Sequence, residues 1–139
     1  MCRLLCLLIV SSVLLGAVPV SAADDPLSVV QAFIDARNGG DIAAASPLMA
    51  DTTASVGGPG CPVASPCVGA AAHQSELEGF AALHAQVTLV APRVSGTTVE
   101  GRMEGRNDLT RAAGVDRTVS DLTADVQDGQ ITTWRVIPD

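Results

Sequence analysis

The chain has 139 residues, with fifteen acidic side chains against eight basic ones and a formal net charge of −7. All eight basic residues are arginine, and the chain has no lysine. Nucleic acid and anionic membrane surfaces both require clustered positive charge, so the composition argues against either of them as a partner.

The first 23 residues have the organisation of a secretory signal peptide. Arg3 supplies a positive charge, residues 4–20 form an apolar run, and small residues follow at a position suited to cleavage. This pattern predicts a secreted or periplasmic protein whose mature chain begins at Ala23 or Asp24. The apolar run is shorter than the roughly 20 residues that a spanning helix prefers. An uncleaved anchor that tethers the domain to a membrane is therefore the second choice.

Residues 24–139 have the size of one domain, and its first predicted element is an amphipathic helix. Asp24 or Asp25 caps the helix, and Pro26 suits its first turn. The run Asn38-Gly39-Gly40 ends it. Between these signals the apolar residues recur at helical spacing: Leu27, Val30, Phe33 and Ile34.

A second, shorter helix follows Asp41, and Pro47 predicts a kink in it because proline removes a backbone hydrogen bond. Residues 52–56 are predicted to form a strand. Residues 57–69 are rich in glycine and proline, which indicates a loop.

The third predicted helix begins at a Ser-x-x-Glu capping box formed by Ser75 and Glu78. His84 then falls in its last turn. His73 precedes the capping box, so we expect it in the loop, near the mouth of a pocket.

Two cysteines remain beyond the signal segment, Cys61 and Cys67, and an even pair in an exported protein predicts a disulfide. A ring of this size is worth about 2 kcal/mol in the chain-entropy model. A metal site would have to recruit His73 and His84 as well, and the cysteine spacing differs from the short one of zinc sites. We therefore predict neither a metal nor any other cofactor.

From Gln86 onward the apolar period changes to two, which predicts strands. The alternating residues include Val87, Leu89 and Ala91 in the first strand, Val99 and Met103 in the second, and Leu122, Ala124 and Val126 in the third. Asp128-Gly129 forms a tight hairpin into a fourth strand that ends near Ile137. A short helix closed by Gly114 separates the middle strands. The pattern predicts an α+β domain with an antiparallel meander.

Three segments together resemble the nuclear transport factor 2-like (NTF2-like) superfamily, in its SnoaL-like and ketosteroid isomerase-like branch. They are residues 27–41, Asp128-Gly129-Gln130-Ile131 and Thr133-Trp134-Arg135. The resemblance implies a cone-shaped, cystatin-like fold, in which a curved antiparallel sheet wraps around three helices and encloses a conical pocket. Members include polyketide cyclases, ketosteroid isomerases, epoxide hydrolases and binding domains without chemistry, so the fold does not decide the function. Homodimers are common among them, which leaves a homodimer open here.

The resemblance also implies a test for catalysis. Epoxide hydrolase-like members use an Asp-Arg-Asp set with a tyrosine. Arg106 and Asp108 match its Arg-x-Asp part, but the second aspartate falls on Val136 and the chain has no tyrosine. Arg106 also shares strand parity with other charged residues, which is typical of a solvated face. An isomerase-like mechanism would need Asp121 or Asp125 together with a histidine.

The candidates for pocket lining are Trp134, Val136, Phe33, His73 and His84, although Trp134 and Phe33 also suit the core. Either histidine could act as a base. The sequence predicts an exported domain without catalysis that binds an apolar small molecule or a partner protein. One alternative is a pocket enzyme that uses Asp108 with Arg106 or a histidine. The other is a membrane-tethered accessory subunit.

Overall fold

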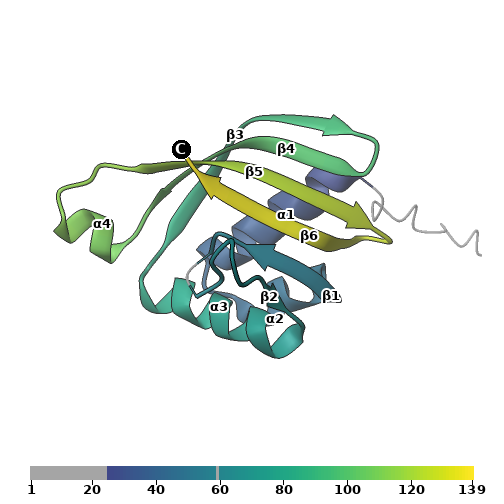
Figure 1. Cartoon of the computed structure of the whole chain (residues 1–139), viewed down its shortest axis with the longest axis horizontal. Coiled ribbons are helices and arrows are strands. Elements are labelled where there is room, and N and C mark those ends of the chain that lie inside the picture. The colour runs from purple at the N-terminus through teal and green to yellow at the C-terminus, as the bar shows by residue number, and fades with distance from the viewer. Residues whose placement is uncertain (1–24, 59) are drawn as a thin grey trace, which may run out of the picture.

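The computed structural model describes residues 25–58 and 60–139, so the predicted signal segment lies outside the described residues (Figure 1). In chain order the elements are α1 Pro26–Asn38, α2 Ile42–Ala45, the 3₁₀ turn η1 Ser46–Leu48, β1 Met49–Val56, β2 Cys67–Val68, α3 Ala70–Ala82, β3 Gln86–Ser95, β4 Thr98–Arg106, α4 Asp108–Ala112, β5 Thr118–Gln127 and β6 Gln130–Pro138. None of these helices has the length and apolar character needed to cross a membrane.

The six strands form one curved sheet in the order β2-β1-β6-β5-β4-β3. Strands β3 to β6 are the predicted antiparallel meander. Asp128 and Gly129 form the predicted turn between β5 and β6, with φ of 51° and 74°, as a type I′ hairpin requires. The α+β fold class is confirmed.

One strand pair departs from the expected antiparallel sheet, because β1 pairs with β6 in parallel. The connection between them contains α3 and the rest of the meander, which provides the long crossover that a parallel pair needs. A threonine fixes this junction, since the Thr53 hydroxyl donates a hydrogen bond of 2.5 Å to the carbonyl oxygen of Ile131.

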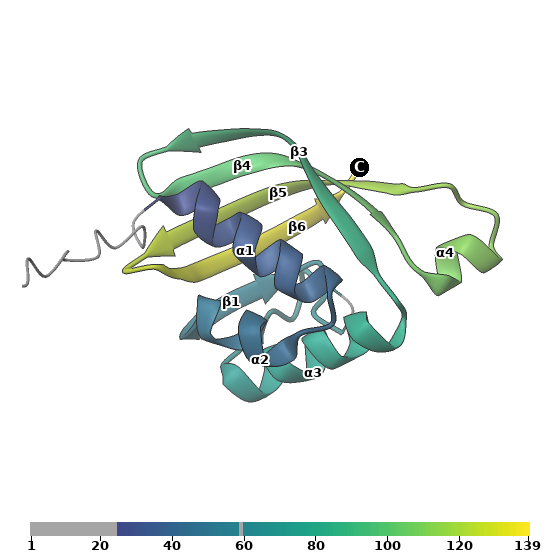
Figure 2. The ribbon, with the colours of Figure 1, turned by 180° about the vertical axis from the view of Figure 1, so that it is seen from behind.

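Helix α1 lies across one face of the sheet, and the sheet curls around it (Figure 2). Asp25 caps the helix by accepting a hydrogen bond from the backbone N–H of Ser28, as predicted. Its apolar stripe is buried, and the Phe33 ring meets the Trp134 ring of β6 edge to face at 4.9 Å between centroids. The main core therefore sits between α1 and the sheet.

The predicted loop of residues 57–69 contains the short strand β2, which pairs with β1. The disulfide between Cys61 and Cys67 is present, with an S–S distance of 2.02 Å. Strand β1 begins at Met49, earlier than predicted. The chain bends at Pro47, where the expected kink is the 3₁₀ turn between α2 and β1.

The predicted start of the third helix is wrong. Helix α3 begins at Ala70, directly after Gly69 with its φ of 92°, and Ser75 lies inside it. The three alanines at 70–72 have the highest helix propensity of any residue, so the helix extends back to the glycine and leaves the capping box unused. His73 is therefore a helical residue. His84 lies beyond the helix, at a φ of 46°.

Candidate functional site

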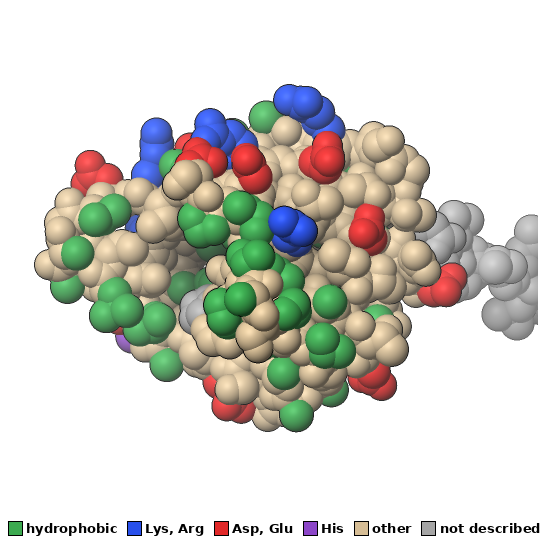
Figure 3. Space-filling view, viewed as in Figure 1, with side chains coloured by type: hydrophobic (Ala, Val, Ile, Leu, Met, Phe, Trp, Pro, Cys, Tyr) green, Lys and Arg blue, Asp and Glu red, His purple; other side chains and the backbone are tan. Residues whose placement is uncertain are grey.

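A cavity of about 710 Å³ opens beside the C-terminal end of β6. Figure 3 shows it as a hollow left of the centre, whereas charged side chains gather along the upper edge of the same view. Apolar side chains on its wall come from α3, β3, β4 and β6: Phe80, Val87, Met103 and Val136. Polar groups such as Asn107 and Ser120 complete the wall. This volume suits a drug-sized molecule.

Among the described residues the cavity wall carries two titratable side chains, Arg106 and Asp139. Arg106 is exposed at the end of β4. The Asp139 carboxylate already accepts a hydrogen bond from the Arg102 guanidinium. The described wall contains no histidine, glutamate or cysteine. It therefore offers a shaped, mostly apolar surface, on which the one described carboxylate side chain is paired with an arginine.

Two glycines bring the loop after β1 against the cavity. A Cβ atom on Gly57, whose φ is 88°, would lie 1.6 Å from the carbonyl oxygen of Val136. A Cβ atom on Gly58 would lie 2.0 Å from Oε1 of Glu76. Gly57 requires glycine, because any side chain there would overlap the backbone of β6, whereas a side chain at Gly58 would displace the carboxylate of Glu76. The loop can thus form part of the cavity wall and contact α3 at the same time.

Behind this wall the buried guanidinium of Arg37 is surrounded by aromatic rings. Its Cζ atom lies 3.9 Å from the ring centroid of Phe80, 5.5 Å from that of Trp134 and 5.6 Å from that of Phe33. These are all the aromatic residues of the chain. Burial lowers the pKa of Arg37 to about 10, and the charge of Glu76 opposes that shift. Arg37 is therefore still a cation at neutral pH, stabilised by cation–π contacts.

The buried carboxylate of Glu76 accompanies this cation. Its Oε2 atom accepts a hydrogen bond of 2.8 Å from the Ser55 hydroxyl, which is fully buried. Five buried side-chain atoms have no hydrogen-bond partner among the described residues: Oε1 of Glu76, Nε and Nη2 of Arg37, Nε1 of Trp134, and Nδ1 of His73. We call Arg37, Ser55, Glu76 and Trp134 the buried cluster. Its unpartnered atoms are unusual, because buried polar groups are almost always hydrogen-bonded.

The buried cluster lies one layer of residues behind the cavity. Phe80 lines the cavity and also stacks on Arg37. Gly58 lines the cavity and also contacts Glu76. One side chain and one glycine therefore separate the buried charges from the open space.

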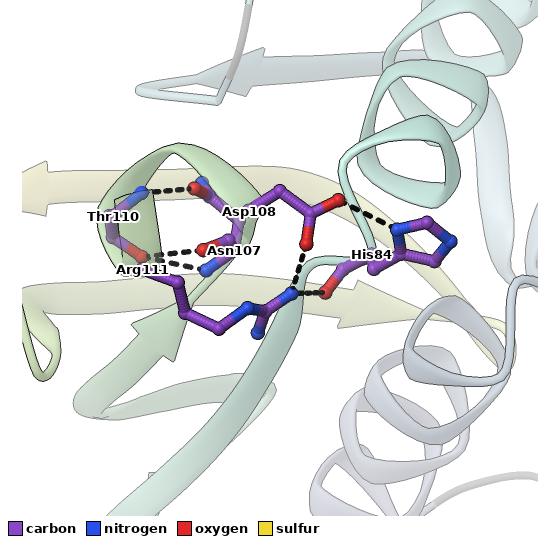
Figure 4. A network of polar contacts seen from close by, with 5 residues as sticks. All are labelled: His84, Asn107, Asp108, Thr110 and Arg111. Atoms are coloured by element: carbon purple, nitrogen blue, oxygen red, sulfur yellow. Dashed lines mark hydrogen bonds and ion pairs between the residues drawn. The ribbon is translucent and has the colours of Figure 1, made fainter. Parts of the chain in front are cut away.

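The predicted catalytic carboxylate, Asp108, lies instead in a surface network (Figure 4). Its Oδ2 atom is 2.7 Å from Nδ1 of His84, and its Oδ1 atom accepts a hydrogen bond of 2.5 Å from Arg111. The hydrogen bond from His84 has the largest effect on the Asp108 carboxyl, followed by the one from Arg111. Both lower the pKa of Asp108 below its usual 3.8. The side chains of Asp108 and His84 are 48% and 77% exposed. Neither residue lines the cavity.

The Arg-x-Asp match does not bring its two members together. Arg106 lies at the cavity, whereas Asp108 begins α4, a short helix that projects beyond the sheet at the ends of β4 and β5 (Figure 1). No ion pair between them exists among the described residues. The structure places Asp108 in contact with His84, outside the cavity.

The other sequence candidates divide between the wall and the core. Val136 lines the cavity, whereas Trp134 and Phe33 are core residues. His73 is not at a pocket mouth, because α3 places it against β1, where its Nε2 atom donates a hydrogen bond of 2.8 Å to the carbonyl oxygen of Thr53.

The two aspartates considered for an isomerase-like mechanism also lie away from the cavity. Asp125 accepts a hydrogen bond of 2.6 Å from the Thr98 hydroxyl. Asp121 is exposed on β5. Within residues 25–58 and 60–139, no three histidine, cysteine or acidic side chains gather where they could hold a metal ion.

Arg37 and Glu76 were not among the residues predicted from the sequence to have a functional role. Arg37 follows Phe33 by four positions, so it lies on the same face of α1 as the apolar stripe, and helical spacing predicts that it is buried. Glu76 lies beside Leu77 and four residues before Phe80, on the inner face of α3. A charge on a predicted apolar stripe was the signal that could have found both residues.

No protein-family model and no curated protein matches this sequence. Several solved structures match most of the chain. An NTF2-like protein of unknown function from Cytophaga hutchinsonii is 16% identical, with a TM-score of 0.65, over 83% of this chain and 90% of that chain. An LEH-like epoxide hydrolase from M. tuberculosis is 18% identical, with a TM-score of 0.66, over 82% and 78%.

A computationally designed 17-OHP binder is also similar, at 18% identity and a TM-score of 0.65, over 82% of this chain and 91% of that chain. The three structures thus include a designed binder, an epoxide hydrolase and a protein of unknown function. At these identities the likeness establishes the fold and leaves the function open. This chain has the NTF2-like fold.

Proposed function

We propose that this domain binds an apolar small molecule in its cavity and catalyses no reaction on it. The observation that carries the proposal is the composition of the cavity wall. The wall is mostly apolar, and its one carboxylate, Asp139, is already paired with Arg102. Burial of apolar ligand surface there supplies the affinity, at about 2.5 kcal/mol for each 100 Å² removed from water.

Acid–base catalysis would need a carboxylate or imidazole within hydrogen-bond reach of the bound molecule. Asp108 and His84 lie off the wall, and both oxygens of Asp108 are already used. The pocket-enzyme alternative retains one supporting observation, the contact of 2.7 Å between these two residues. The designed 17-OHP binder supports binding as a use of the same fold.

We also propose an extracytoplasmic location for the domain. The disulfide is compatible with an oxidising compartment. The signal-like N-terminal segment supports the same reading. Intact-mass analysis of secreted protein should give a chain that begins at Ala23 or Asp24 with no free thiols. Recovery of the full chain in the membrane fraction would favour a tethered domain instead.

Blocking the cavity tests the binding function. Ser120 pairs with Met103 on the cavity-facing side of the sheet, so the indole of Ser120→Trp fills the open space. Thr123→Trp is the matched control, because it carries the same substitution on the same strand, away from the cavity. Uncharged probes such as progesterone, limonene and 1-decanol should raise the melting temperature of the wild type and of the control. They should leave the melting temperature of Ser120→Trp unchanged.

The same proteins test for catalysis. We expect no turnover of epoxide, enone-steroid or polyketide-like substrates by the wild type or by Asp108→Asn. Turnover by the wild type that falls by orders of magnitude in Asp108→Asn would overturn the proposal and establish the enzyme alternative.

A further inference from the structure

The buried cluster presents hydrogen-bonding capacity that nothing in the described protein uses. Arg37 is 5% exposed, Glu76 7% and Trp134 1%. The cluster's three unpartnered donor atoms are Nε and Nη2 of Arg37 and Nε1 of Trp134, and its unpartnered acceptor is Oε1 of Glu76. The Trp134 ring centroid lies 5.5 Å from Cζ of Arg37, and the charge of Glu76 acts on Arg37. An unsatisfied buried polar atom destabilises the folded protein, so a ligand group that pairs with these atoms would gain affinity from each of them.

Building on the binding function proposed above, we propose that Arg37, Glu76 and Trp134 form a polar subsite for the hydroxyl end of an otherwise apolar ligand. The apolar body of the ligand occupies the cavity, and its hydroxyl group reaches the buried cluster behind Phe80. The ligand class is therefore an uncharged, apolar alcohol.

The balance of donors and acceptors selects the hydroxyl group. A hydroxyl donates one hydrogen bond and accepts two, so it can donate to Oε1 of Glu76 while it accepts from Arg37 and Trp134. A carboxylate would bring a second negative charge beside Glu76, and an ammonium group would bring a second positive charge beside Arg37. An alkane would leave all four atoms unpartnered.

Phe80 controls the path from the cavity to the subsite. Its side chain is half-buried, lines the cavity and covers one face of the Arg37 guanidinium. In this proposal a change of the Phe80 rotamer lets the hydroxyl group pass from the cavity to Arg37. On the other side, Oε1 of Glu76 lies so close to Gly58 that only hydrogen atoms on Gly58 fit between them. The acceptor oxygen is thus held against the cavity wall.

Three probes of one chain length test the subsite: 1-decanol, decane and decanoate. Titration calorimetry on the wild-type protein should show that decanol binds at least tenfold more tightly than either of the others. Trp134 is the only tryptophan in the chain, so its fluorescence reports directly on the subsite. Decanol should shift its emission, whereas decane should leave the emission unchanged.

The outcomes separate this inference from the proposed function. Equal affinities for the three probes, or decanol binding without a change in Trp134 emission, would overturn the subsite and leave cavity binding intact. Failure of all three probes to bind would overturn both.

Two substitutions sharpen the test. Glu76→Gln keeps the size of the side chain and removes its charge, so the affinity for decanoate relative to decanol should rise at least tenfold. Glu78→Gln, on the exposed face of the same helix, should leave this ratio unchanged.

Phe80→Leu keeps an apolar wall and uncovers Arg37, so decanol should associate faster in stopped-flow fluorescence. An unchanged selectivity in Glu76→Gln would contradict the subsite, as would an unchanged association rate in Phe80→Leu.

Discussion

Two polar networks in this domain use the same chemical groups in opposite surroundings. The surface network joins Asp108, His84 and Arg111, with every contact at hydrogen-bond distance and all three side chains largely solvated. The buried cluster holds Glu76 and Arg37 near enough for their charges to interact, with several atoms unpartnered and almost no access to water. Water competes for the polar groups of the surface network and is excluded from the buried cluster. The buried cluster should therefore contribute more to the free energy of unfolding, although fewer of its atoms are paired.

The largest predicted effect comes from breaking the buried cluster on one side. Arg37→Leu or Glu76→Leu leaves one buried charge uncompensated by the nearby opposite charge, and each should lower the free energy of unfolding by about 3–5 kcal/mol. Urea denaturation measures this loss. The double variant Arg37→Leu/Glu76→Leu should recover most of it, because no buried charge remains. Arg135→Leu, an exposed change on β6, should stay within about 0.5 kcal/mol of wild type.

Alkaline pH should stabilise the wild type relative to that double variant. The folded pKa of Arg37 is about 10, below the ordinary 12.5, so the unfolded chain binds more protons between these values. The free energy of unfolding therefore rises with pH in this range, by about 1 kcal/mol near pH 11. Few other groups interfere, since the chain has no lysine or tyrosine. If urea denaturation gives the same difference in free energy of unfolding between the two proteins at every pH from 8 to 11, the lowered pKa of Arg37 is wrong.

Removal of the disulfide should have an effect of intermediate size. Cys61 is buried with its sulfur 3.7 Å from Glu76, so the ring holds its loop over the buried cluster. The double variant Cys61→Ala/Cys67→Ala should cost about 2 kcal/mol in urea denaturation. A loss as large as that of Glu76→Leu would show that the ring fixes the cluster itself and does more than shorten a loop.

The surface network should give the smallest effect. Asp108→Asn should change the melting temperature little at neutral pH, and less in high salt. Hydrogen bonds lower the folded pKa of Asp108 below 3.8, so any stabilisation is present above pH 3.8 and is lost as the pH falls through the lower folded value. The difference in melting temperature between Asp108→Asn and the wild type should therefore vanish in acid, with Asp116→Asn as the exposed control. A difference that grows as the pH falls would contradict the predicted direction.

Local sequence signals predicted much of the architecture and failed where a stronger neighbour competed. The helix with the Asp25 cap and the Asp128-Gly129 hairpin were both identified, because each is fixed by residues adjacent in the chain. The capping box at Ser75 satisfied the same kind of rule and was still wrong. The alanines before it favoured the helix more strongly than the box favoured a start.

The site was harder to predict because its members come from distant segments. Arg37, Glu76 and Trp134 lie on α1, α3 and β6, and no local pattern relates them. The family resemblance pointed to Arg106 and Asp108, which are two positions apart and easily recognised. In the structure those two diverge, whereas Arg37 and Glu76, which are buried behind the cavity wall, had been given no role.

The position of β6 also determines the order in which this domain can fold. β6 follows every other described strand in the chain, yet it lies near the middle of the sheet, between β5 and the parallel strand β1. Until β6 is in place, β1 and β2 cannot join the meander, and the apolar face of α1 lacks Trp134. We therefore expect the β1–β6 contact to be the slow step of folding, because it closes a loop of roughly 80 residues.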